Sequence, residues 1–174
     1  MIIEDEEFLS KPCESTDIEE GRKIINLLAD ALKNSQSEGI GLAANQIGIQ
    51  KRVCILRIPE KKKVYGYDLI NPKIVSRTIP VIVKGEGCLS FPNQFIKTFR
   101  YLQVKVVDDL MPEGQILNDW AAVCAQHEID HLDGVTMYSR ALSKLNPTSL
   151  CQCESGKVFK DCCHAKLIKD LKII

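Results

Sequence analysis

One pentapeptide constrains this chain more than any other feature: residues 127–131 read His-Glu-Ile-Asp-His, the pattern H-E-x-x-H. In a helix, residues four apart lie one turn apart on the same face, so both imidazoles can bind one metal ion. Glu128 then lies beside the metal, where a carboxylate can act as a general base. The pattern therefore predicts a helix with Asp119 as its N-cap, ending at Gly134, that bears part of a metal-dependent hydrolytic site.

Two histidines do not complete a catalytic metal site, which usually has three protein ligands and one open position. No histidine or glutamate follows at the downstream offsets that the common zinc proteases use. Upstream, Cys88 lies in the segment Glu-Gly-Cys-Leu-Ser at residues 86–90 and offers a thiolate. Cys88 is therefore the candidate for the third ligand.

Length, composition and charge bound the class of protein. The chain has 174 residues, is 45% hydrophobic and carries 23 basic and 23 acidic side chains, which indicates one compact domain with a small appendage. The balanced charge gives no basic field for binding DNA or anionic lipid. No apolar run approaches the roughly 18 residues of a spanning helix, and the first residues are acidic. We therefore expect a cytoplasmic protein with no membrane or direct DNA partner.

The spacing of apolar residues predicts an α+β fold. Thr16 to Glu19 has the spacing of a capping box, and apolar residues recur at helical steps over residues 17–36, before Gly39. Short apolar runs between turn residues predict strands at 53–56, 68–70, 81–83, 103–107 and 115–117. The expected architecture is a set of mostly antiparallel sheets around a central H-E-x-x-H helix, with a small C-terminal zinc knuckle.

Half of the eight cysteines lie near the C-terminus, at Cys151, Cys153, Cys162 and Cys163. Without a secretory context, metal ligation explains such a cluster better than disulfides do, and four thiolates make a closed, structural Zn²⁺ site. A polar linker with Pro147 precedes the cluster, so we divide the chain into a catalytic domain, 1–146, and a zinc-binding tail, 147–174.

Three segments together resemble one enzyme family. Residues 39–46 read Gly-Ile-Gly-Leu-Ala-Ala-Asn-Gln, residues 86–90 read Glu-Gly-Cys-Leu-Ser, and residues 126–131 read Gln-His-Glu-Ile-Asp-His. In this order they resemble the signature segments of the peptide deformylases. The resemblance implies a metal ion held by Cys88, His127 and His131, with Glu128 as the acid and base and water in the fourth position. It also implies that the Gln46 side-chain amide and the Leu89 backbone N–H stabilise the oxyanion.

The resemblance further implies the substrate, an N-formylmethionyl peptide of a nascent chain that loses its formyl group as formate. In that family the peptide lies like an added strand against the segment with Ile40 and Gly41. Helical spacing places Val123 and Cys124 one turn before His127, which nominates them, with Trp120, for the slot that takes the first side chain.

The identity of the metal and the support of its ligands are separate questions. A thiolate with two imidazoles suits Fe²⁺, Zn²⁺, Ni²⁺ and Co²⁺, and the resemblance favours Fe²⁺. Glu86 and Arg100 flank the ligand loop, and the resemblance suggests that they form an ion pair that orients Cys88; two solvated charges are the alternative.

The tail resembles the SEC-C motif at the end of the bacterial preprotein-translocation ATPase, although Glu154 stands where glycine is usual. Either Cys163 or His164 can be the fourth zinc ligand, and the motif favours Cys163. Two roles are open for the tail: a docking element for the ribosome, the nascent chain or a protein partner, or a staple in place of the C-terminal helix of the deformylases.

Two other functions compete with deformylation. A metallopeptidase would use the same H-E-x-x-H helix, but it lacks a downstream third ligand here and leaves Cys88 without a role. A binding module with a structural metal would leave Gln46 and Glu128 without a role. Formate release distinguishes all three.

Overall fold

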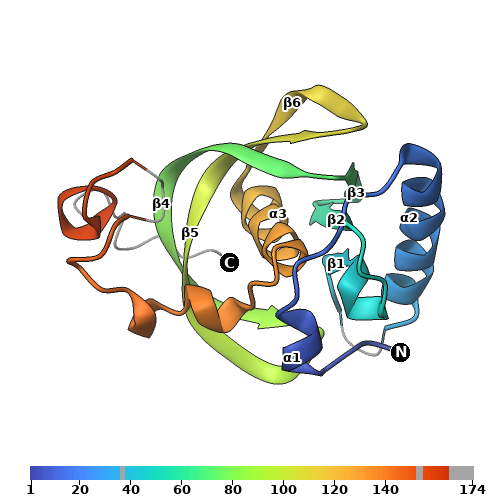
Figure 1. The fold of residues 1–174 in the computed structure, drawn as a ribbon, viewed down its shortest axis with the longest axis horizontal. Helices are drawn as coiled ribbons and strands as arrows, with labels where there is room; N and C mark the ends of the chain where they lie inside the picture. The colour runs from blue at the N-terminus through green and yellow to red at the C-terminus, as the bar shows by residue number, and fades with distance from the viewer. Residues whose placement is uncertain (36–37, 152–154, 165–174) are drawn as a thin grey trace.

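Helix α3 (Asp119–Leu132) contacts strands of two different β-sheets (Figure 1). The structure is a computed structural model that describes residues 1–35, 38–151 and 155–164. On one side α3 packs against β1 and β2, and on the other it packs against β5 and β6. The helix therefore lies between the two sheets, and all its residues from Ala121 to Leu132 are buried.

Among the described residues, the strands form two three-stranded sheets, in the orders β1-β2-β3 and β4-β5-β6, and every pairing is antiparallel. The strands are β1 (Gly41–Ala43), β2 (Val53–Glu60), β3 (Lys63–Ile70), β4 (Lys73–Cys88), β5 (Phe91–Asp108) and β6 (Met111–Asn118). The remaining elements are α1 (Glu6–Leu9), α2 (Ile18–Lys33) and the 3₁₀ helices η1 (Ala44–Ile47), η2 (Met137–Arg140), η3 (Leu142–Lys144) and η4 (Phe159–Asp161). The prediction of an α+β fold with antiparallel sheets is confirmed.

The strands of the second sheet are much longer than the apolar runs that predicted them. β4 has 16 residues and β5 has 18. Their pairing continues through exposed polar positions such as Lys84 opposite Lys97, where side-chain hydrophobicity gives no signal but the backbone ladder persists. Register shifts on either side of Glu86 bend the end of β4 toward the turn that follows Cys88.

Both predicted helices are present, with shifted ends. The N-cap of α2 is Asp17, which accepts a hydrogen bond of 2.8 Å from the Glu20 N–H, because the Thr16 hydroxyl bonds the Glu20 carboxylate instead. This helix ends at Lys33 rather than at residue 36. Helix α3 has Asn118, not Asp119, as its N-cap and ends two residues before Gly134. The capping patterns therefore located the helices correctly to within three residues.

Helix α2 covers the first sheet at close range. Its buried Leu28 joins a core cluster with Ile55 of β2 and Ile70 of β3. A Cβ atom at Gly21 would lie 2.6 Å from Cδ1 of Ile70, so only glycine permits this approach. Within the described ranges, every helix falls short of the length and apolar character that a membrane span requires.

Candidate active site

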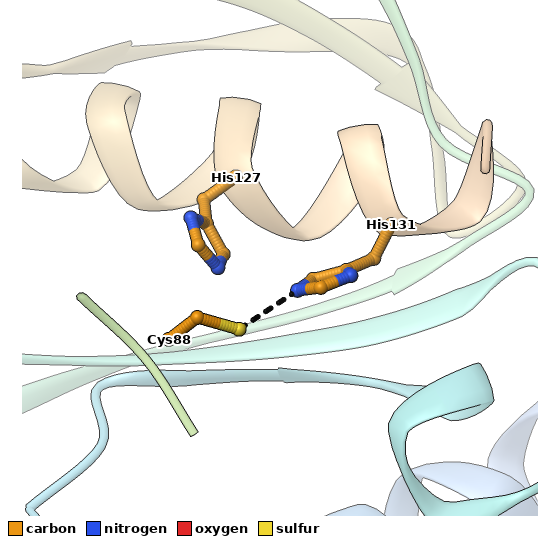
Figure 2. A group of neighbouring side chains, drawn as sticks. All are labelled: Cys88, His127 and His131. Carbon is orange, nitrogen blue, oxygen red and sulfur yellow. Dashed lines mark hydrogen bonds between the residues drawn. The ribbon is translucent and has the colours of Figure 1, made fainter. Parts of the chain in front are cut away.

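The structure brings Cys88, His127 and His131 together, although the cysteine and the nearer histidine are 39 positions apart in the sequence. Figure 2 shows the three side chains turned toward one another, two from α3 and one from the end of β4. Their ligand atoms all lie within 4.8 Å of one another, and Cys88 Sγ lies 3.2 Å from His131 Nε2. All three side chains can therefore bind a single metal ion.

The chemistry of this donor set fits a catalytic metal ion. Burial lowers the pKa of His131 to about 3, with a further contribution from His127, so the imidazole is neutral and keeps a lone pair for a metal. One sulfur and two nitrogens suit Zn²⁺, Fe²⁺, Co²⁺ or Ni²⁺. Three protein ligands also leave one position open, as catalytic sites require.

A buried ionic network holds His127 in place. Arg100 donates from Nη2 to Glu86 Oε1 at 2.6 Å and from Nη1 to Asp130 Oδ2 at 2.5 Å. The same Oε1 of Glu86 lies 2.7 Å from His127 Nδ1, which fixes the ring with Nε2 as the atom left for the metal. Burial alone would raise the pKa of Glu86, but Arg100 outweighs it and holds the pKa well below its usual range.

The network contains the ion pair that the sequence suggested and adds a contact that it did not predict. The ion pair between Glu86 and Arg100 is present, and both side chains are buried rather than solvated. Among the candidate metal ligands, the one that Glu86 contacts directly is His127. The reason is the packing of α3 against β5, which brings His127 and Asp130 to the strand that bears Arg100.

The surroundings of Glu128 suit a side chain that accepts and donates a proton. Its carboxylate is buried, and Oε2 has no hydrogen-bond partner among the described residues. Burial raises the pKa of Glu128 to about 7, although the nearby His127 opposes the rise. The carboxylate lies directly against Gly41, since a Cβ at that position would overlap Oε1. An unpartnered carboxyl oxygen beside a candidate metal site is typical of a general acid and base.

Gln46 directs an amide donor toward the same site. Its Oε1 accepts a hydrogen bond of 2.9 Å from the Ala43 N–H, which fixes the orientation of the amide. Its Nε2 then lies 3.1 Å from Ser90 Oγ and 3.5 Å from Cys88 Sγ. Leu89 follows Cys88 directly, in the turn between β4 and β5. The Gln46 amide therefore lies beside the segment that contains Cys88, Leu89 and Ser90.

A cavity of about 320 Å³ opens onto these groups. Its lining includes the four residues that the sequence nominated for substrate binding: Ile40, Gly41, Val123 and Cys124. Trp120 lines the cavity as well. Strand β1, which contains Gly41, is an edge strand of its sheet, so an extended peptide can lie beside it.

A second cysteine cluster lies in the tail. Cys151, Cys162 and Cys163 are buried, and their sulfurs lie within 4.8 Å of one another. Of the four cysteines predicted to bind zinc, Cys153 lies outside the described residues. The imidazole of His164 instead packs against Phe159, with ring centroids 5.5 Å apart.

Several residues that support the site were not found from the sequence. Ser90 bonds Gln46, Thr98 donates to Glu86 at 2.5 Å, and Asn45 donates to the His131 carbonyl at 2.7 Å. A position for Asp130 near His127 could have been predicted from the sequence, because Asp130 lies one turn after His127 on the same helix. The other three contacts join distant segments, and no local pattern marks them.

Comparison with known proteins identifies the family. A family model described as polypeptide deformylase matches residues 2–147. The chain is 39% identical over 159 residues to a peptide deformylase of Wolbachia pipientis wMel, covering 83% of this chain and 87% of that protein. A peptide deformylase of Aquifex aeolicus is 35% identical over 147 residues, covering 80% and 85%.

Solved structures agree with the sequence comparison. A probable peptide deformylase from synechococcus phage S-SSM7 has a TM-score of 0.68 and 32% identity, covering 80% of this chain and 98% of that one. Peptide deformylase from Plasmodium falciparum has a TM-score of 0.71 and 27% identity, covering 81% and 86%. With the fold, the site and the sequence in agreement, the chain belongs to the peptide deformylase family.

Proposed function

We propose that Cys88, His127 and His131 hold the metal ion with which this peptide deformylase removes the N-formyl group from nascent polypeptides. The observation that supports this assignment is the meeting of one sulfur and two imidazoles within 4.8 Å, beside the unpartnered carboxylate of Glu128. When bound, the ion supplies Lewis acidity and an activated water at the formyl group.

Glu128 moves the proton in this reaction. It takes a proton from the attacking water as the new C–O bond forms, and it delivers that proton to the amine nitrogen as the C–N bond breaks. The products are formate and a peptide with a free amino terminus. A pKa of about 7 suits both directions of transfer, because the carboxyl group is then neither a very weak acid nor a very weak base near neutral pH.

Gln46 and Leu89 stabilise the negative charge that develops on the formyl oxygen. The Gln46 Nε2–H and the Leu89 backbone N–H are the donors, and the bond from Ala43 holds the Gln46 amide in its donating orientation. Loss of one such donor typically costs on the order of a hundredfold or more in rate.

The cavity beside the metal site receives the initiator residue. Val123 and Cys124 form the slot for the formylmethionine side chain, since an unbranched thioether adapts well to an apolar cavity. Ile40 and Gly41 bind the peptide backbone along the edge of β1. The native metal is Fe²⁺, with Zn²⁺, Ni²⁺ or Co²⁺ able to replace it in the same donor set.

Formate release from a formylmethionyl tripeptide tests this function. We expect Fe²⁺- or Ni²⁺-loaded protein to release formate under anaerobic conditions, and Glu128→Gln to lower kcat by roughly a hundredfold to ten-thousandfold with its metal content unchanged. Glu113→Gln, on the exposed part of β6, serves as the matched control. The absence of formate from metal-loaded wild-type protein would disprove the proposal, and full activity of Glu128→Gln would remove that residue from the mechanism.

For the tail, we infer a structural Zn²⁺ site formed by Cys151, Cys153, Cys162 and Cys163 in a C-terminal segment, residues 147–174, that packs on the catalytic domain 1–146. The clustered sulfurs support it, as does the end of the family match at residue 147. Hydroxyl groups lie near two of the sulfurs, Ser155 Oγ at 3.1 Å from Cys162 and Tyr101 at 3.4 Å from Cys163.

The packing of the tail favours stabilisation over docking as its role. Phe159 meets Phe99 edge to face, with ring centroids 5.2 Å apart, and the tail cysteines join the core cluster that contains β5 and α3. A site that docks the ribosome or a nascent chain needs an exposed surface, whereas these tail side chains are buried against the catalytic part.

A further inference from the structure

One residue of β5 is bound both by the catalytic helix and by the tail. The Tyr101 carbonyl accepts a hydrogen bond of 2.7 Å from Gln126 Nε2, and the Tyr101 N–H donates one of 3.1 Å to Gln126 Oε1. The phenolic oxygen of Tyr101 lies 3.4 Å from Cys163 Sγ in the tail. All three side chains are buried, so Tyr101 connects the tail to α3 in the interior of the molecule.

Gln126 takes the place of a strand partner at this point. Tyr101 pairs with Pro80 across the second sheet, and proline has no N–H to donate to the ladder. The Gln126 amide donates to the Tyr101 carbonyl instead, and it also donates to the Ala122 carbonyl at 2.9 Å. The position of α3 on β5 therefore depends on where the Tyr101 backbone lies.

The same contact adjoins the buried network at the candidate metal site. Gln126 directly precedes His127, and Tyr101 directly follows Arg100. Arg100 donates to Glu86, whose carboxylate orients His127. A shift of the Tyr101 backbone would therefore move both ends of this network, the guanidinium on β5 and the imidazole on α3.

A metal ion in the tail would change the group that Tyr101 contacts. Cys151, Cys162 and Cys163 have sulfurs within 4.8 Å of one another. A bound ion holds Cys163 as a thiolate, and a hydroxyl donates a stronger hydrogen bond to an ionised acceptor than to a neutral one. Without the ion, the thiol of Cys163 is only a weak acceptor. Metal binding in the tail therefore fixes Tyr101 more firmly.

We propose that the tail thiols form a regulatory metal site, at which Zn²⁺ strengthens the binding of the catalytic metal ion through Tyr101 and Gln126, two positioning residues for His127. Coupling of this kind is reciprocal, so the catalytic ion also strengthens the binding of zinc in the tail. The inference rests on the proposed function, because it assumes that Cys88, His127 and His131 hold the catalytic ion.

Nickel retention with zinc in the tail tests the coupling. Protein loaded with one equivalent of Zn²⁺ and then one of Ni²⁺ is dialysed against graded chelator concentrations, and elemental analysis counts the two metals separately. Without chelator, Cys88→Ser keeps its zinc but loses its nickel, which assigns each metal to its site. We expect Cys163→Ser to weaken nickel binding by about five- to a hundredfold, and Tyr101→Phe to reproduce part of that loss.

A double-mutant cycle separates this coupling from a general loss of packing. If Tyr101 transmits the effect, Tyr101→Phe/Cys163→Ser binds nickel no more weakly than Cys163→Ser alone, whereas independent losses add. Ser155→Ala is the matched control, because its hydroxyl lies 3.1 Å from Cys162 Sγ but the residue is exposed in the tail. This variant should leave nickel affinity unchanged. Affinities are compared at a temperature where the fluorescence of Trp120 shows every variant to be folded.

The possible results separate the inference from the proposed function. Equal nickel affinities in wild type, Tyr101→Phe and Cys163→Ser would overturn the inference and leave the tail as a staple only, while the proposed function stands. Losses that add in the double variant, or a Cys88→Ser protein that takes up no zinc, would overturn it as well. Failure of nickel-loaded wild-type protein to release formate would overturn the proposed function, and the regulatory role with it.

Discussion

At the level of single residues, the site depends on the absence of a side chain at Gly41 as much as on the side chains that are present. Gly41 lets the Glu128 carboxylate and the Cys124 thiol approach the backbone of β1, and a Cβ atom there would overlap both. The sequence could nominate the candidate ligands and Glu128, because H-E-x-x-H spacing and the Cys88 segment are local patterns, and the structure brings the three candidate ligands together. The contact of Glu86 with His127 could not be predicted, since it depends on how α3 packs on the second sheet.

Gly41→Ala tests this close approach. The added methyl group displaces the Glu128 carboxylate, and a displacement of about 1 Å can cost a hundredfold in rate. We therefore expect kcat for formate release to fall on the order of a hundredfold, with the fold retained by circular dichroism. Gly66→Ala on β3 is the control, because its Cβ meets only Arg57, at 3.4 Å. Unchanged turnover in Gly41→Ala would show that Glu128 tolerates movement.

Glu86→Gln tests the support of His127. Neutral glutamine cannot hold both Arg100 and the imidazole as the carboxylate does, and loss of such a supporting group typically weakens metal binding by about ten- to a hundredfold. Metal retained after dialysis against graded chelator concentrations measures this affinity, at a temperature where both proteins are folded. Asp68→Asn, which alters an exposed pair with Arg57, provides the comparison. Equal affinities for wild type and Glu86→Gln would exclude a supporting role.

At the level of elements, local sequence patterns located the helices but underestimated the strands. Capping residues and helical periodicity act within a few residues, so α2 and α3 were found with small errors at their ends. The long strands β4 and β5 are held by backbone pairing over exposed polar stretches, and β1 is a short buried strand without alternation. Hydrophobic periodicity cannot reveal such strands, because the order of apolar and polar side chains along them does not follow the backbone pairing.

Gly21→Ala probes the packing of α2 on the first sheet. In an exposed helix this change would stabilise the protein by about 1 kcal/mol. Here the new methyl group meets Ile70 at 2.6 Å, so we expect a loss of about 1 to 3 kcal/mol in the free energy of unfolding, measured by urea denaturation. Shortening the partner in Gly21→Ala/Ile70→Val should recover part of this loss, as a double-mutant cycle would show. A stabilised Gly21→Ala would contradict the close contact.

At the level of the whole molecule, two distant parts of the chain share one core. Family membership rules out the metallopeptidase and the binding module that the sequence left open. From the composition of the linker, the sequence predicts a boundary between residues 146 and 147. It could not reveal that Phe159 and Cys163 pack against Phe99 and Tyr101, since that contact spans some sixty residues and leaves no periodic signal.

Phe159→Ala tests whether this shared core stabilises the catalytic part. Removal of a buried phenylalanine typically costs about 3 to 5 kcal/mol, which lowers the melting temperature by roughly 6 to 12 °C or more in a chain of this length. Trp120 is the only tryptophan and lies at the start of α3, so its fluorescence reports unfolding of the catalytic part alone.

If the tail acts as a staple, the Trp120 transition of Phe159→Ala moves down by that amount in a single step, because the tail and β5 unfold together. Leu150→Ala, at a 72% exposed position of the tail, should leave the transition within about 1 °C, since exposed substitutions rarely exceed 0.5 kcal/mol. An unchanged Trp120 transition in Phe159→Ala, with full turnover of short peptides and reduced turnover of ribosome-bound chains, would instead identify the tail as a docking element.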